Sequence, residues 1–205
     1  MFPRLYAIVD RGCFGDANAF FRQTHALLDS GVTLLQYRDK TSEPREMLAN
    51  AREIQRLSAG RARLIVNDRA DLCLAAACDG VHLGQDDLSP EAVRGIVGAH
   101  LWVGVSTHSP EQLQVADNTS ADYLAIGPVF STGSKANPDP VVGLEGVRAA
   151  RQLTSKPLVA IGGITRANCR EVFTAGADSI AVISDLLQEP DKSAQEFLRI
   201  LKDLR

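Results

Sequence analysis

Residues 33–68 read TLLQYRDKTSEPREMLANAREIQRLSAGRARLIVND. Two short apolar runs, Thr33–Lys40 and Arg63–Asp68, enclose Pro44–Ala59, in which apolar residues recur at helical spacing. A strand, a helix and a second strand in this order predict two neighbouring parallel strands joined by a crossover helix. Neither strand alternates strictly between apolar and polar residues, so we expect the sheet to be covered on both faces.

The same pattern recurs along the whole chain. We expect strands over Leu5–Asp10, Thr33–Lys40, Arg63–Asp68, Gly80–Gly84, Trp102–Thr107, Tyr123–Val129, Pro157–Gly162 and Ser179–Ser184. Helical patterns lie over Ala19–Ser30, Pro44–Ala59, Leu72–Ala77, Ser89–Val97, Pro110–Ala116, Leu144–Leu153, Arg166–Ala175 and Ser193–Leu204. This repetition predicts one domain over residues 1–205, an α/β (β/α)₈ TIM barrel with short loops. An open doubly wound sheet is the alternative.

Composition limits the functions to consider. The chain has 205 residues, 45% hydrophobic and 23% charged, and a formal net charge of −3, so bulk electrostatics gives no support for nucleic-acid binding. No apolar stretch approaches the roughly 18 residues of a membrane span, and the N-terminus lacks a signal-peptide pattern. The four cysteines form no CxxC pair, which favours reduced thiols in a cytoplasmic protein over a zinc site.

Three long polar side chains occupy every second position at the end of the second expected strand. They are Gln36, Arg38 and Lys40. Alternating strand residues face the same way, so these three share the face of Leu34. Buried cations are costly unless they are paired. We therefore expect the strand to end at a site for a ligand with several negative charges.

Polar residues also follow the other expected strands. They are Asn67-Asp68-Arg69, Gly84-Gln85-Asp86-Asp87, Ser106-Thr107-His108, Ser131–Lys135, Gly162–Thr165 and Ser184-Asp185. Turn chemistry would explain any one of these segments alone. Together they indicate an active site at the carboxyl ends of the barrel strands, where such barrels carry it.

Two kinds of anion site are expected there. Asp68 and Asp87 end neighbouring strands and suit Mg²⁺ with phosphate and water oxygens, although Asp86 is an alternative to Asp87 and each aspartate could instead cap a turn. Gly162-Gly163 and Ser184 suit a phosphate held by backbone N–H groups. Two phosphorylated ligands, one a diphosphate, would suit transfer of a group from the diphosphate to the other ligand.

The ordered motifs resemble the thiamine-phosphate synthase family. The resemblance rests on Gln36–Lys40, Val66-Asn67-Asp68, His82–Asp87, Gly104–Ser109, Gly127–Lys135, Ile161–Ile164 and Val182-Ile183-Ser184, which together span most of the chain. It implies that hydroxymethylpyrimidine diphosphate loses pyrophosphate and that the nitrogen of hydroxyethyl-methylthiazole phosphate attacks the pyrimidine methylene. The implied product is thiamine phosphate, made in a Mg²⁺-dependent transferase reaction of thiamine biosynthesis.

The resemblance also implies roles for single residues. The pyrimidine diphosphate site would comprise Gln36, Arg38, Lys40, Asn67 and Lys135, with Tyr37 and Asp39 in the same binding segment. The Mg²⁺ ligands would be Asp68 and Asp87. The thiazole phosphate site would comprise Thr132, Gly133, Ser134, Gly163, Ile183 and Ser184. Ser106 and Lys135 are the catalytic candidates. The family often has Thr-x-Thr-Lys where this chain has Thr132-Gly133-Ser134-Lys135, a change that keeps a hydroxyl donor.

Two other functions remain open from the sequence. A thiazole tautomerase of the same superfamily would share the thiazole phosphate site. Such an enzyme would not need a Mg²⁺ ion bound to a diphosphate. A non-catalytic binder of thiamine precursors would retain the whole pocket. A homo-oligomer is compatible with the sequence.

Several residues carry other expectations. We expect His82 in the core or behind the site, His108 at the mouth, and Tyr37, by alternation, facing the helices. The segment Ser131–Val142 is long for a loop of this kind and predicts either a lid or a rigid surface loop.

Overall fold

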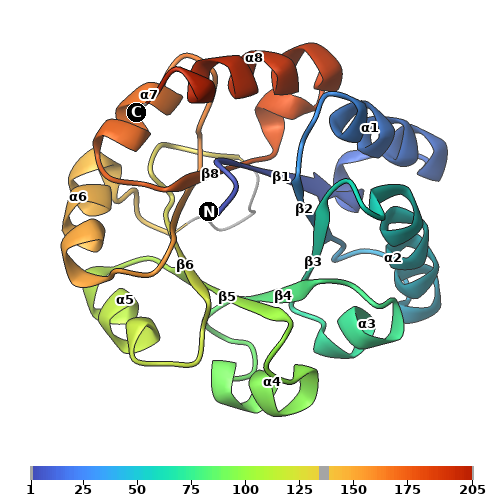
Figure 1. Ribbon diagram of the computed structural model, residues 1–205, viewed down its shortest axis with the longest axis horizontal. Helices are drawn as coiled ribbons and strands as arrows, with labels where there is room; N and C mark the ends of the chain where they lie inside the picture. The colour runs from blue at the N-terminus through green and yellow to red at the C-terminus, as the bar shows by residue number, and fades with distance from the viewer. Residues whose placement is uncertain (1, 134–138, 205) are drawn as a thin grey trace.

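The computed structural model describes residues 2–133 and 139–204, and within them eight parallel strands close into a barrel (Figure 1). The strands are β1 (Leu5–Asp10), β2 (Leu34–Arg38), β3 (Arg63–Asn67), β4 (Gly80–Leu83), β5 (Trp102–Thr107), β6 (Tyr123–Ile126), β7 (Leu158–Ile161) and β8 (Ser179–Val182). They pair in chain order, and β1 also pairs with β8, with Leu5 opposite Ile180. The predicted (β/α)₈ barrel is confirmed, and the open sheet is excluded because β1 has a neighbour on each side.

Helices form the outer ring around the barrel (Figure 1). Among the described residues they are α1 (Ala17–Asp29), α2 (Pro44–Ser58), α3 (Ala70–Ala75), α4 (Pro90–Val97), α5 (Pro110–Asp117), α6 (Gly143–Leu153), α7 (Cys169–Thr174) and α8 (Pro190–Lys202). Helices α4 and α5 start where their Ser-Pro-Glu sequences indicate. The Ser89 side chain accepts a hydrogen bond from the Ala92 N–H, and the Ser109 side chain accepts one from the Gln112 N–H.

Some boundaries differ from those expected. Helix α1 begins at Ala17, earlier than Ala19, because the Asp16 carboxylate accepts a hydrogen bond from the Ala19 N–H and caps the first turn. Strand β2 ends at Arg38, so Lys40 lies in the following loop. Two short 3₁₀ helices, η1 (Arg11–Cys13) and η2 (Ser184–Leu186), were not expected, since three residues carry no recognisable periodicity.

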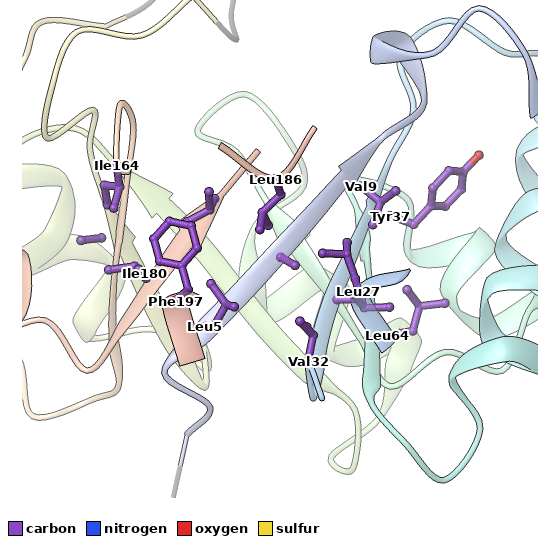
Figure 2. Packing of buried hydrophobic residues seen from close by; sticks show 14 of the residues in the cluster. Leu5, Val9, Leu27, Val32, Tyr37, Leu64, Ile164, Ile180, Leu186 and Phe197 are labelled. Carbon is purple, nitrogen blue, oxygen red and sulfur yellow. The ribbon is translucent and has the colours of Figure 1, made fainter. Parts of the chain in front are cut away.

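The barrel wall separates an inner apolar cluster from a large outer one, and a smaller outer cluster of Ala70, Val81, Leu83, Val93, Val97 and Val103 packs β4 and β5 against α3 and α4. The outer cluster packs the strands against the helices, and Figure 2 shows some of its members, including Leu27, Tyr37 and Phe197. The inner cluster fills the barrel and consists of Tyr6, Ile8, Leu34, Ile65, Tyr123, Ala125, Val159 and Ala181. Alternation along each strand sends neighbouring residues to opposite clusters, which explains why the strand sequences are apolar nearly throughout.

The cysteines are free thiols in the structure. Cys13 is exposed, whereas Cys73, Cys78 and Cys169 are buried. Burial raises the pKa of Cys73 to about 11 and that of Cys78 to about 12, so both are inert core residues at neutral pH. Over residues 2–133 and 139–204, no helix is both long and apolar enough to span a bilayer.

Candidate active site

A cavity lies at the carboxyl ends of the strands. Its lining includes eight residues predicted from the sequence, namely Gln36, Arg38, Asn67, Ser106, Thr132, Gly163, Ile183 and Ser184. Its apolar lining includes Tyr6 and Ile8 of β1, Ala125 of β6 and Val159 of β7, which belong to the inner cluster. The closed barrel thus brings to one cavity residues that lie far apart in the sequence.

The first wall of the cavity carries an arginine held by a buried carboxylate. Arg38 pairs with the carboxylate of Asp10, which is 5% exposed at the end of β1. The other Asp10 oxygen accepts a hydrogen bond of 3.0 Å from the Gly12 N–H. Asp10 was missed from the sequence, where it appeared only as the last residue of a strand; its pairing with Arg38 depends on β1 lying beside β2.

Beside this wall, Asp68 and Asp87 lie close to each other and to Lys40. Asp68 pairs with the Lys40 ammonium and has a φ of 63°, a left-handed conformation that is uncommon outside glycine. Asp87 accepts a hydrogen bond of 2.7 Å from the Gly84 N–H. Burial and the neighbouring Asp68 carboxylate raise the pKa of Asp87. The structure thus favours Asp87 over Asp86 as the partner of Asp68.

The chemistry of these donors fits a hard divalent cation. Two carboxylates that repel each other are stabilised by added positive charge, and oxygen ligands are those that Mg²⁺ prefers. Within the described residues, no group of three or more His, Cys, Asp or Glu side chains could hold a metal ion. A cation at Asp68 and Asp87 would therefore take its remaining ligands from substrate oxygens and water, as Mg²⁺ commonly does.

A second wall is formed by the loops after β7 and β8. Gly163 has a φ of 63°, and a Cβ there would lie 2.5 Å from the Ser131 carbonyl oxygen, so only glycine fits. Asn168 holds this turn by donating to the Gly163 carbonyl at 3.0 Å. Ile183 and Ser184, from the end of β8, line the same part of the cavity. The wall exposes backbone and a hydroxyl, which suits a phosphate.

Ser106 of β5 lies between the two walls. Its hydroxyl is 2.8 Å from Nε2 of His82, and its carbonyl accepts a hydrogen bond of 2.6 Å from the Gln85 side chain. His82 is 7% exposed, which agrees with the expected core position, and it also lines the cavity. These contacts fix the position of Ser106 from two directions.

His108 also lines the cavity, at its mouth. Its Nδ1 lies 2.6 Å from the carbonyl oxygen of Gly127, and its Nε2 lies 3.4 Å from a carboxylate oxygen of Asp139. Asp139 lines the cavity but was not identified from the sequence, because no local pattern marks an acidic residue in a long loop as part of a site.

Tyr37 and Asp39 lie outside the cavity. Tyr37 is 2% exposed, packs in the outer cluster and donates a hydrogen bond of 2.8 Å to Asp39. The other Asp39 oxygen accepts from the backbone N–H groups of Thr41 and Ser42. Burial favours a higher pKa for Asp39, but these donors outweigh it and lower the pKa. Tyr37 thus faces the helices as expected, and Asp39 holds the loop that carries Lys40; a substrate-binding role for either residue stays a prediction.

Part of the predicted site lies outside the described residues. Ser134 and Lys135 fall between residues 133 and 139, and so does the middle of the expected lid, Ser131–Val142. Gly133 is exposed and does not line the cavity. The roles of Ser134 and Lys135 and the closure of the loop remain predictions.

Three comparisons with known proteins agree with this geometry. Residues 5–186 match the family model described as thiamine monophosphate synthase. The thiamine-phosphate synthase of Koribacter versatilis is 61% identical over 202 residues, covering 97% of the chain and 96% of that relative. The thiamine-phosphate synthase of Caldicellulosiruptor bescii is 39% identical over 192 residues, covering 92% and 88%.

Solved structures point the same way. Thiamine phosphate pyrophosphorylase from Pyrococcus furiosus superposes with a TM-score of 0.87 at 34% identity, covering 98% of the chain and 96% of that structure. The resemblance expected from the motifs is confirmed by these matches. The chain belongs to the thiamine monophosphate synthase family.

Proposed function

We propose that this protein joins hydroxymethylpyrimidine diphosphate to hydroxyethyl-methylthiazole phosphate, giving thiamine phosphate and pyrophosphate. The observation that supports the proposal is a single cavity lined by Arg38, by Ser106, and by Gly163 and Ser184, residues that suit two phosphorylated ligands. Arg38 belongs to the wall suited to a diphosphate, and Gly163 and Ser184 to the wall suited to a monophosphate. Two phosphorylated substrates can therefore meet with their reacting carbon and nitrogen atoms near Ser106.

Departure of pyrophosphate is the step that the first wall would assist. Arg38 and Lys40 carry fixed positive charges that stabilise the charge developing on the leaving group more than they stabilise the intact substrate. Asp68 and Asp87 would hold Mg²⁺, which when bound neutralises diphosphate oxygens. Asn67, at the end of β3, lines the same wall and can hydrogen-bond the pyrimidine or its diphosphate.

The second wall would bind and orient the acceptor. The Gly163 turn lets the thiazole phosphate approach the backbone closely, and the Ser184 hydroxyl can donate to its oxygens. Binding both substrates in one cavity converts a reaction between two separate molecules into one between held neighbours. The apolar lining from Ile8, Ala125 and Val159 limits attack by water on an electron-poor pyrimidine.

Turnover with purified protein tests the proposal directly. The protein, both precursors and Mg²⁺ should give pyrophosphate and thiamine phosphate in equal amounts, and EDTA should stop the reaction until Mg²⁺ is restored. The absence of turnover with both precursors and Mg²⁺ present would refute the proposal. Thiazole isomerisation without the pyrimidine substrate would indicate a tautomerase, and tight binding of both precursors without turnover would indicate a binding protein.

The cellular setting is also part of the proposal. The free thiols, three of them buried, are compatible with a reducing cytoplasm, where the precursors and Mg²⁺ would be available. Assembly into a homo-oligomer remains a prediction, which sedimentation of the purified protein would check.

A further inference from the structure

A line of hydrogen bonds crosses the inside of the barrel from Gln36 to Ser106. The Gln36 side-chain N–H donates to the Tyr6 hydroxyl at 2.8 Å, and the hydroxyls of Tyr6 and Tyr123 are 3.0 Å apart. The Tyr123 hydroxyl is 3.0 Å from Nδ1 of His82, whose Nε2 is 2.8 Å from the Ser106 hydroxyl. The five side chains come from β2, β1, β6, β4 and β5, so the line joins strands across the barrel.

The line is shielded from solvent. Tyr6 is 1% exposed, Tyr123 is fully buried, Gln36 is 3% exposed and His82 is 7% exposed. Burial raises the pKa of both tyrosines, so each keeps its hydroxyl proton at neutral pH. Inside an apolar barrel these groups have little water to bond with, which makes each contact in the line costly to break.

The Gln36 end of the line gives a consistent set of donors and acceptors. An amide N–H can only donate, so Tyr6 accepts from Gln36, and its own proton then has the Tyr123 hydroxyl as its neighbour in the line. In this direction Tyr123 donates to Nδ1 of His82, and His82 is then a neutral imidazole with no proton on that nitrogen. Nε2 carries the proton and donates to Ser106, whose own hydroxyl proton is left for the cavity.

We infer that Tyr6, Tyr123 and His82 are positioning residues that make Ser106 a hydrogen-bond donor towards the substrate. The inference rests on the proposed function, in which Ser106 lies beside the reacting pyrimidine. The substrate atom opposite the Ser106 hydroxyl must then be an acceptor with a lone pair, such as a pyrimidine ring nitrogen, and a donor group there would be rejected. Gln36, which lines the same cavity, sets the direction of the line from the other end.

The barrel makes room for this line at Gly104 of β5. A Cβ at Gly104 would lie 2.0 Å from Cζ and 2.4 Å from the hydroxyl oxygen of Tyr123. The Tyr123 ring thus occupies the place of a side chain on the neighbouring strand, and this brings its hydroxyl within reach of His82. The ring also stacks on His82 at 5.5 Å between centroids.

The tautomer of His82 tests the direction of the line without any substrate. In ¹⁵N NMR spectra of ligand-free protein at neutral pH, Nε2 of His82 should be protonated and Nδ1 should not. The His82 signals are identified by their loss in the His82→Asn variant. Protonation at Nδ1 instead would reverse every donor in the line and overturn the inference.

Kinetics of Tyr123→Phe tests the effect on Ser106. The variant keeps the ring and removes only the hydroxyl, so the His82 tautomer should become mixed and kcat should fall about tenfold, the usual value of one hydrogen bond. The KM for thiazole phosphate, which binds at the other wall, should change less than about twofold. Tyr6 lies one hydrogen bond further from His82, so Tyr6→Phe should change the His82 tautomer and kcat in the same direction as Tyr123→Phe, but by less.

Tyr37→Phe is the matched control. It removes a buried tyrosine hydroxyl on the outer side of the barrel wall and should leave the His82 signals unchanged. If Tyr123→Phe changes neither the His82 tautomer nor kcat, the positioning role is wrong. If Tyr123→Phe does not fold, the His82 tautomer of the wild-type protein still tests the direction of the line. A wild type that shows the expected tautomer but no turnover would refute the proposed function and not the direction of the line.

Discussion

At the scale of single residues, the candidate metal site consists of two carboxylates, Asp68 and Asp87, that lie close together. The Asp68 and Asp87 carboxylates lie close enough for Asp68 to raise the pKa of Asp87, and the Lys40 ammonium works in the opposite direction. A single exposed lysine neutralises only one of the two negative charges. A cation bound between the carboxylates would relieve this imbalance, and that role stays a prediction; Asp68 also has the uncommon φ of 63°.

The first prediction compares two neighbouring aspartates. Asp87→Asn should lower kcat/KM at least about tenfold and raise the Mg²⁺ concentration needed for half-maximal rate, since even groups that only support metal ligands contribute tenfold or more. Asp86→Asn is the control with the same chemical change and should stay within about twofold. Pyrophosphate release measured over a Mg²⁺ titration decides, and a larger effect at Asp86 would reverse the assignment.

Arg38 and Asp10 illustrate what single positions reveal in the sequence. The alternation of Gln36 and Arg38 was visible because side chains in a strand repeat every two residues, and both line the cavity. Asp10 was not visible as a site residue, because its role comes from Arg38 of the adjacent strand. A local pattern identifies which face a residue shares, but not its partner across the sheet.

At the scale of elements, a serine followed by proline is a local signal that located two helix starts. The Ser89-Pro90 and Ser109-Pro110 pairs marked the starts of α4 and α5 because the capping bond joins residues three apart. Helix α8 begins at Pro190, three residues before the expected Ser193, although its N-cap residue Glu189 makes no side-chain capping bond. Its position depends on packing in the outer cluster through Phe197.

The second prediction concerns these caps. Ser89→Ala should lower the free energy of unfolding by about 1 kcal/mol, because it removes the acceptor for the Ala92 N–H. Glu43→Ala, at the N-cap of α2, should change it by less than about 0.5 kcal/mol, because the Glu43 side chain forms no capping bond. Urea denaturation of both variants is the measurement, and equal losses would show that the Ser89 hydroxyl does not cap α4.

At the scale of the whole molecule, closure of the barrel decides which small residues are required. A Cβ added at Gly95 in α4 would meet no atom within 4 Å. At Gly104, the space for a Cβ is occupied by the Tyr123 ring from the next strand. Nothing in the local sequence distinguishes the two glycines as space for another side chain. The difference arises because β5 pairs with β6 and both face the crowded interior.

The third prediction exploits this contrast. Gly104→Ala should destabilise the protein by about 1–3 kcal/mol, because a methyl group would force the Tyr123 ring to move in a filled core. Gly95→Ala should stabilise it by about 0.5–1 kcal/mol, because alanine is the better helix former and meets no neighbour. Thermal denaturation should show Tm shifts of opposite sign; a shared sign would show that the interior at Gly104 is not tightly packed.

The sequence by itself determined the order of strands and helices and the polar residues at the strand ends, including Gln36, Arg38 and Asp68, and it predicted the barrel with an open sheet as the alternative. These follow from periodicity and from local hydrogen bonding, which act within a few residues. Only the tertiary structure decided that Asp10 holds Arg38 and that Tyr6, Tyr123 and His82 connect Gln36 to Ser106. Such contacts join side chains of different strands that lie far apart in the sequence and meet only in the folded barrel, so no local pattern encodes them.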